Sequence, residues 1–265
     1  MEVAKKECVS IIVPAYEAGN YLARCLESLI NQTYTNVEII IVYKKSSDNT
    51  EALLDHYKDR VKIIEQMGKS PANARNLGIA QCKGKYVAFC DADDVFHVEK
   101  TEKQVAFAKE HEVDLVYSDF YLIDRNGDVI DKVKTPDWDF ETWLRSGYIA
   151  FSTVMIKRES LVKAHCFDER WSSIEDFDLL IRLSQCADFK RMPEYLTCRR
   201  IHKGNLSRSG KTLLSRSSVY YSHGFTSLAI SSFMKGVVSS KLVHFLMDHP
   251  SLYARVRRLL RNRRE

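Results

Sequence analysis

The sequence predicts an α/β fold with a mostly parallel central sheet flanked by helices, and two observations support this prediction. Over roughly the first 95 residues, short apolar runs rich in β-branched residues alternate with segments whose apolar residues recur at helical spacing. Such alternation is typical of a parallel sheet that is covered by helices on both faces. After residue 100 the pattern becomes mixed, and from about residue 212 it is mostly helical.

The individual elements follow from these patterns in the order β-α-β-α-β-α-β. We expect buried strands at 9–13, 37–43, 61–64 and 86–90. Between them we expect helices at 21–30, 48–57 and 71–80, the last with Pro71 in its first turn. Later we expect a helix at 100–109, a strand at 114–123, a hairpin turn at Asn126-Gly127 followed by a short strand, and a helix at 175–186.

The distribution of charge indicates one main domain with a basic appendage. We expect a domain at 1–207 and a helical C-terminal extension at 208–265. The net charge is +5, but the segment 254–265 alone contains six arginines and one acid, and basic and acidic residues are equal in number elsewhere. This distribution disfavours a uniformly basic nucleic-acid binder, whereas contact between the tail and an anionic membrane surface stays open.

Cysteine usage and the termini indicate a cytoplasmic protein. The seven cysteines are odd in number and form no CxxC motif, which favours free thiols in a reducing compartment. The charged N-terminus does not resemble a signal peptide, and no stretch is apolar enough for a membrane span. Peripheral binding to the inner face of the membrane is compatible with these features.

The most informative motif is the acidic turn Asp91-Ala92-Asp93-Asp94, which follows the fourth expected strand. Carboxylates this close repel one another, and a cation relieves the repulsion. Aspartate oxygens suit Mg²⁺ or Mn²⁺, and a metal held by few carboxylates keeps positions open for diphosphate oxygens. The alternative is a solvated turn that caps the next helix. A position at the carboxyl end of a parallel strand favours the metal interpretation.

Four segments carry a resemblance to a known family, and they occur in the order 9–17, 74–80, 89–94 and 167–183. They read VSIIVPAYE, ARNLGIA and FCDADD, with FDE and EDFDL in the last. In this order and spacing they are similar to glycosyltransferase family 2, whose inverting enzymes have the nucleotide-sugar-binding fold called GT-A. The similarity extends over roughly residues 8–210.

The resemblance implies a role for each matching residue. The residues implied to contact the donor nucleotide sugar are Pro14, Ala15, Tyr16, Glu17, Arg75, Asp91 and Ala92, with Arg75 approaching the phosphates and Asp91 the ribose and sugar. Asp93 is implied to bind the metal, and His202, in a segment that closes over the diphosphate, to be a further metal ligand or a phosphate donor. Asp176 is implied to be the catalytic base, with Glu175 shaping the acceptor site. The alternative role for Asp176 is that of a helix N-cap.

The implied activity is metal-dependent, inverting transfer of a sugar from a nucleotide-diphosphate donor, with UDP expected. The implied acceptor is a hydroxyl of a saccharide or lipid-linked glycan in surface polysaccharide synthesis. Mn²⁺ or Mg²⁺ would neutralise charge on the departing diphosphate, and one base would take the proton of the acceptor hydroxyl. The apolar segment 220–247 leaves three roles open: covering the acceptor side, contacting a membrane, or forming an oligomer.

One segment departs from the family. Where members carry paired acids and a glycine after the second strand, this chain has Tyr43-Lys44-Lys45, although Ser46 and Asp48 remain. Lysine cannot accept a hydrogen bond from a base or a ribose hydroxyl. The nucleotide is therefore read by other groups, or Lys44 contacts a donor phosphate or an anionic donor sugar, or the protein is a non-catalytic relative that acts as a binding or scaffold protein.

Overall fold

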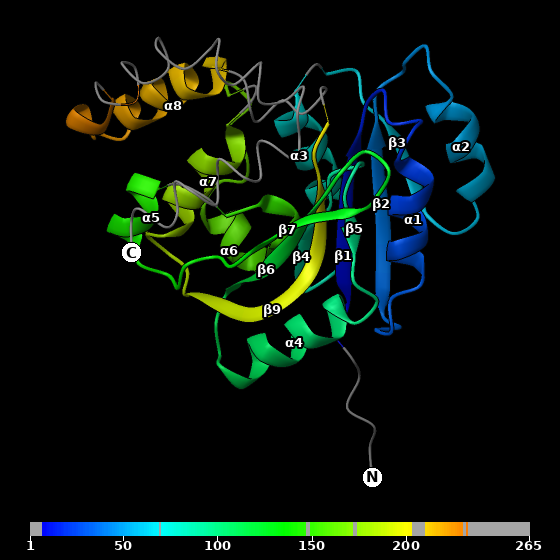
Figure 1. The fold of residues 1–265 in the computed structure, drawn as a ribbon, viewed down its shortest axis with the longest axis horizontal. Coiled ribbons are helices and arrows are strands. Elements are labelled where there is room, and N and C mark those ends of the chain that lie inside the picture. Colours follow the sequence, from blue (N-terminus) through cyan, green and yellow to red (C-terminus); the bar gives the residue numbers. More distant parts are fainter. Residues whose placement is uncertain are drawn as a thin grey trace.

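The structure is a computed structural model that describes residues 7–68, 70–146, 149–171, 174–202, 210–229 and 232. The basic tail 254–265 and most of the segment 220–247 lie outside these residues. Figure 1 shows a central sheet with helices around it. The expected alternation in the first part of the chain is confirmed: the elements are β1 (Val9–Ala15), α1 (Leu22–Ile30), β2 (Val37–Tyr43), α2 (Thr50–Tyr57), β3 (Lys62–Glu65), α3 (Pro71–Gln81) and β4 (Tyr86–Phe89).

The later part of the chain contains more strands than expected. Its elements are β5 (Val95–Phe96), α4 (Lys100–Glu110), β6 (Leu115–Ile123), β7 (Val129–Val133), α5 (Phe140–Ser146), the 3₁₀ turn η1 (Phe151–Thr153), β8 (Met155–Lys157), α6 (Arg158–Lys163), α7 (Glu175–Leu183), β9 (Phe189–Arg200) and α8 (Gly210–Ser222). The hairpin turn between β6 and β7 is confirmed, and Gly127 adopts φ 101°, a left-handed conformation that favours glycine.

The strands form a single sheet in the order β3-β2-β1-β4-β8-β6-β9-β5, and β7 pairs with β6. The four strands β3, β2, β1 and β4 are parallel, as expected. In the second half, β8 is antiparallel to both neighbours while β6 and β9 are parallel, so the complete sheet is mixed. Because β1, β2 and β4 run in one direction, the loops that follow them meet at one edge.

The sheet separates two apolar clusters, one on each face. Along β1, Ile12 belongs to one cluster, whereas Ile11 and Val13 belong to the other, as the alternation of a strand requires. The helices α1, α2 and α4 contribute to the Ile11 cluster, and α3, α6, α7 and the start of the C-terminal extension contribute to the Ile12 cluster. Figure 1 shows α1 and α2 beside the first strands and α5, α7 and α8 at the opposite end.

A glycine sets how closely α3 approaches the sheet. A Cβ at Gly78 would lie 2.5 Å from Cγ2 of Ile12 in β1, which is closer than packed carbons come. Glycine therefore brings α3 against the sheet, and Arg75, one turn earlier, lies beneath the loop that follows β4. All seven cysteines are free thiols. Across the described residues, every helix is too short or too polar to span a bilayer.

Candidate active site

The acidic turn lies at the carboxyl edge of the sheet, directly after β4. Carboxylate oxygens of Asp91, Asp93 and Asp94 lie within 4.8 Å of one another. Asp94 is 1% exposed, and burial followed by the charges of Asp93 and Asp91 raises its pKa well above the usual range. Its Oδ2 is buried and has no hydrogen-bond partner among the described residues. Converging carboxylates with an oxygen left over suit a divalent cation.

The end of β9 braces this turn from the other side. The backbone N–H of Arg200 donates to Oδ1 of Asp94 at 2.9 Å, and Nε of Arg200 donates to the carbonyl of Asp93 at 2.9 Å. Two residues later, Nε2 of His202 lies 2.8 Å from Oδ2 of Asp93. The imidazole also stacks on Tyr21, with ring centroids 5.0 Å apart. The structure therefore brings together the two residues that sequence analysis assigned to the metal.

A buried arginine connects the acidic turn to α7. Arg75 is 6% exposed, and its guanidinium lies 5.6 and 5.5 Å from the ring centroids of Phe151 and Phe167. Its Nη2 donates to Oδ1 of Asp91 at 2.9 Å, and its Nη1 donates to Oε1 of Glu175. Sequence analysis placed Arg75 against the donor phosphates. In the structure its hydrogen bonds join Asp91 of the acidic turn to Glu175 of α7, and its role toward the phosphates stays a prediction.

Asp176 is the second residue of α7, which begins at Glu175, so it is not the N-cap that sequence analysis left open. Its Oδ1 accepts the backbone N–H of Phe177 at 2.8 Å. Burial, and then the charge of Glu175, raises the pKa of Asp176 to about 6, although Arg75 opposes the shift. A carboxylate with such a pKa is ionised at neutral pH and is more basic than an ordinary aspartate, which suits a general base.

Loops after β1 and β2 form the expected nucleotide side of the site. Tyr16 is 52% exposed, and Nζ of Lys44 lies 4.9 Å from the centroid of its ring. The backbone N–H of Lys44 donates to the carbonyl of Ala15, which fixes the two loops side by side. Pro14 and Ala15 are still part of β1, and Glu17 turns the chain with φ 48°.

Two residues that hold the loops of the site, Asp48 and Ser152, were not assigned a role from the sequence. Asp48 holds the first loop, because its Oδ2 accepts the backbone N–H of Gly19 at 2.8 Å. Burial favours the protonated form of Asp48, but hydrogen bonds from Thr50, Ser46 and Gly19 lower its pKa to about 2. Ser152 fixes the acidic turn by accepting the backbone N–H of Asp91 at 3.1 Å. Ala92 lies partly buried within that turn and packs on the Ile11 cluster.

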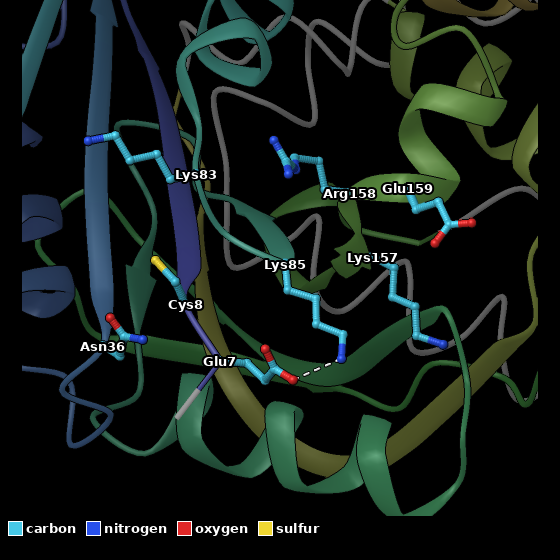
Figure 2. Close-up of a pocket in the computed structure, with 8 residues that line it drawn as sticks. All are labelled: Glu7, Cys8, Asn36, Lys83, Lys85, Lys157, Arg158 and Glu159. Carbon is cyan, nitrogen blue, oxygen red and sulfur yellow. Dashed lines mark hydrogen bonds and ion pairs between the residues drawn. The ribbon is translucent and has the colours of Figure 1, made fainter. Parts of the chain in front are cut away.

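A cavity of about 470 Å³ lies elsewhere, near the amino ends of β1, β2 and β4 (Figure 2). Two of its cations are neutralised within the chain: Lys85 pairs with Glu7 at 2.9 Å, and Lys157 pairs with Asp114 at 2.8 Å. Because it lies at the amino ends of these strands, the cavity is at the opposite edge of the sheet from Asp91. Neither its position nor its paired cations indicate a site for the donor.

Comparison with known proteins decides the family. The sequence profile described as Glycosyl transferase family 2 matches residues 10–167, which is more than half of the chain. The chain belongs to glycosyltransferase family 2. It is 33% identical over 224 residues to E. coli WfaP, named as a UDP-Glc:alpha-D-GlcNAc-diphosphoundecaprenol beta-1,3-glucosyltransferase, covering 82% of this chain and 87% of WfaP. It is 32% identical over 204 residues to E. coli chondroitin synthase, covering 75% of this chain.

This chain spans only part of the length of several of its relatives. It covers 30% of chondroitin synthase and 27% of an uncharacterised Rickettsia bellii glycosyltransferase. Solved structures confirm the GT-A fold: residues 1–349 of S. aureus TarS with UDP-GlcNAc superpose with a TM-score of 0.67 and 18% identity, over 88% of this chain and 73% of that fragment. The mannosyltransferase PcManGT from Pyrobaculum calidifontis, solved with GDP-Man and Mn²⁺, superposes with a TM-score of 0.66 and 16% identity. The match covers 95% of this chain and 75% of the PcManGT chain. The expected family, fold and class of enzyme are therefore confirmed.

Proposed function

We propose that the chain transfers a sugar from a UDP-linked donor to a hydroxyl of a lipid-linked glycan, with inversion at the sugar carbon. The observation that supports this proposal is the pair of ionic hydrogen bonds from the buried Arg75, which join Asp91, the residue that we assign to the donor, to Glu175, the residue that we assign to the acceptor. Asp176 follows Glu175 directly. We infer that the donor site and the base are thereby held in a fixed relative position, which a single displacement reaction requires.

On the donor side, Asp93 and His202, with Asp91 and Asp94 beside them, are the residues that would hold Mn²⁺ or Mg²⁺. The bound metal would neutralise charge that grows on the departing diphosphate. The residues fit such an ion because three carboxylates converge and Oδ2 of Asp94 is buried without a partner among the described residues. Tyr16 and Lys44 supply an exposed ring and a cation for the base and phosphates of the nucleotide.

On the acceptor side, Asp176 takes the proton of the attacking hydroxyl. The hydroxyl oxygen forms the new bond to the sugar carbon as the bond to the diphosphate breaks, so the nucleoside diphosphate leaves with the electron pair. Attack occurs opposite the leaving group, and the configuration inverts. Glu175 accepts a hydrogen bond from Arg75, and its charge contributes to the raised pKa of Asp176.

The relatives support the choice of substrates. The printed name of WfaP gives UDP-Glc as donor and a sugar linked through diphosphate to undecaprenol as acceptor, and WfaP is matched over most of its length. TarS was crystallised with UDP-GlcNAc. We extend the proposal to the remaining expectations: a domain at 1–207, an extension at 208–265 whose arginines contact an anionic membrane surface, and a cytoplasmic location at its inner face.

A screen of UDP-, GDP-, CMP- and dTDP-sugars tests the proposal. We expect a rise in melting temperature with UDP-sugars in the presence of Mn²⁺ or Mg²⁺, and transfer to an alkyl N-acetylglucosaminyl diphosphate. Proton NMR of the product would show the anomeric configuration opposite to that of the donor. If no nucleotide binds with or without metal, the alternative of a scaffold protein, suggested by Tyr43-Lys44-Lys45, is favoured.

A further inference from the structure

Helix α8 and the residue that follows it, His223, present three side chains to α7 from one face. Arg216, Tyr220 and His223 are spaced four and three residues apart, so they share that face. Nε2 of His223 lies 2.8 Å from Oδ1 of Asp178, and the ring of Tyr220 packs edge-on against Phe177 at 5.4 Å. The hydroxyl of Tyr220 also donates to the carbonyl of Leu144 in α5. These contacts fix the position of α8.

Arg216 extends this row toward the first turn of α7. Its guanidinium carbon lies 4.1 Å from the ring centroid of Phe177, the residue that follows Asp176. Burial lowers the pKa of Arg216, while Tyr220 and the charge of Asp176 oppose this effect. Within the described residues, no carboxylate lies within ion-pair distance of the guanidinium. Arg216 is therefore near the proposed base without being bonded to it.

The guanidinium of Arg216 has unmet hydrogen bonds. Its Nε and Nη2 are buried, and neither has a partner among the described residues. Nε of Arg75 is likewise without a partner, but Arg75 forms two ion pairs with carboxylates, and Arg191 donates to both oxygens of Asp119. A buried donor without an acceptor is costly, and in native proteins such a group points to strain, to a catalytic role, or to a bound water or ion. The ligand that matches two parallel N–H donors is an oxyanion.

We propose that Arg216 binds the diphosphate of a lipid-linked acceptor, so that the sugar bearing this diphosphate presents its hydroxyl to Asp176. This inference rests on the proposed function. In such an acceptor the attacked hydroxyl and the diphosphate belong to the same sugar ring, and Arg216 packs on Phe177, the residue that follows Asp176. The planar guanidinium fits phosphate oxygens in a way that a lysine cannot reproduce. A carboxylate on an acidic sugar would offer the same chemistry, and the experiment separates the two sources.

The test compares three soluble acceptors: a short alkyl N-acetylglucosaminyl diphosphate, the neutral alkyl glycoside of the same sugar, and a glycoside that carries a uronic acid. The variants are Arg216→Met and Arg216→Lys, and the control is Arg145→Met, which removes an exposed arginine from α5. For Arg216→Met we expect KM for the diphosphate acceptor to rise about 10- to 100-fold, which is the effect of losing a charge-assisted bidentate contact. KM for the neutral glycoside and the affinity for UDP should stay within about twofold, and Arg216→Lys should lose less.

The melting temperature is the second measurement. Arg216 forms no ion pair among the described residues, and its Nε and Nη2 donate to none of them, so Arg216→Met should melt at the same temperature as the wild type or higher. A lower melting temperature with equal losses on all three acceptors would show a packing role and overturn the proposal. So would an unchanged KM for the diphosphate acceptor, or a rise confined to the uronic acid glycoside.

Failure of the proposed function gives a different result. In that case the wild type transfers to none of the acceptors. Arg216 is then tested by calorimetric titration with the alkyl sugar diphosphate alone. Weaker binding by Arg216→Met than by wild type supports the anion site, and equal or absent binding by both overturns it.

Discussion

Nε2 of His202 lies 2.8 Å from Oδ2 of Asp93, although 109 positions separate the two residues in the chain. The contact joins the end of β9 to the turn after β4. Parallel pairing of β9 with β6, and the bonds from Arg200 to the turn, hold it in place. The two residues thus form one unit at the acidic turn.

Removing either member should weaken metal-dependent donor binding. We expect Asp93→Asn to abolish the effect of Mn²⁺ on the affinity for UDP, because the amide carries no charge for the cation. We expect His202→Gln to weaken binding about 10- to 100-fold, as for residues that ligate or orient metal ligands. Calorimetric titration of UDP with and without Mn²⁺ measures both, and His97→Gln, at a 49% exposed histidine, is the control. Wild-type affinity in Asp93→Asn would contradict the assignment.

The pH profile should report Asp176. Its pKa is raised to about 6, and only the ionised carboxylate can accept a proton. The rate of transfer at saturating donor should therefore fall below about pH 6, approaching a tenfold loss per pH unit, and should be level from about pH 7 to 8. A rate that is constant down to pH 4.5 would indicate a different base.

The raised pKa of Asp176 should also make the stability of the fold depend on pH. Because the pKa of Asp176 is higher in the folded chain than in the unfolded chain, protonation favours folding. The stabilisation is present below about pH 4 and is lost as pH rises through about 6. Asp176→Asn, which cannot ionise, should raise the melting temperature by a few degrees at pH 7.5 and by less at pH 5. A variant that melts lower than wild type at pH 7.5 would argue against the raised pKa.

Substitution of Arg75 should lower the melting temperature, whereas substitution of Arg216 should not. Its removal leaves Glu175 buried without a counter-charge, which costs about 3–5 kcal/mol. We expect Arg75→Met to lower the melting temperature by about 10 °C and to abolish transfer. Arg170→Met is the control, because Arg170 pairs with Asp168 at the surface and its side chain is 82% exposed. A double variant, Arg75→Met with Glu175→Leu, should recover stability without recovering activity.

Tyr16 and Lys44 should affect nucleotide affinity alone. If the ring and the cation contact the nucleotide, Tyr16→Ala and Lys44→Ala should each weaken UDP binding about 5- to 20-fold without changing the melting temperature of the free protein. Tyr221→Ala, at a tyrosine that is 72% exposed on α8, is the control. Unchanged affinity in both variants would show that other groups read the nucleotide.

The parts of the fold that the sequence predicted are those with a simple physical signal. Strands β1, β2 and β4 are mostly buried on both faces, so apolar residues dominate each of them. By contrast, β8 has three residues, and β9 contains Pro193 and several charges and shifts register against β6. Such strands are stabilised by their neighbours in the sheet, and local sequence carries little trace of them.

In the candidate site, too, some residues could be recognised from local sequence, whereas others depend on tertiary packing. Asp91, Asp93 and Asp176 occur in short motifs that can be recognised along the chain. The bridge from Arg75 to Glu175 joins residues 100 positions apart, and the burial of Arg216 depends on how α8 packs on α7. Contacts of this kind arise only when the helices assemble, so they were visible in the structure and not in the sequence.

The most direct test of the account is to measure UDP binding and sugar transfer on one variant, Asp176→Asn. The account predicts that calorimetry gives the wild-type affinity for UDP with Mn²⁺, while transfer to an alkyl sugar diphosphate falls at least about 1000-fold, since the donor site is intact and only the base is lost. Transfer within tenfold of the wild-type rate would contradict the central claim that Asp176 takes the proton of the acceptor.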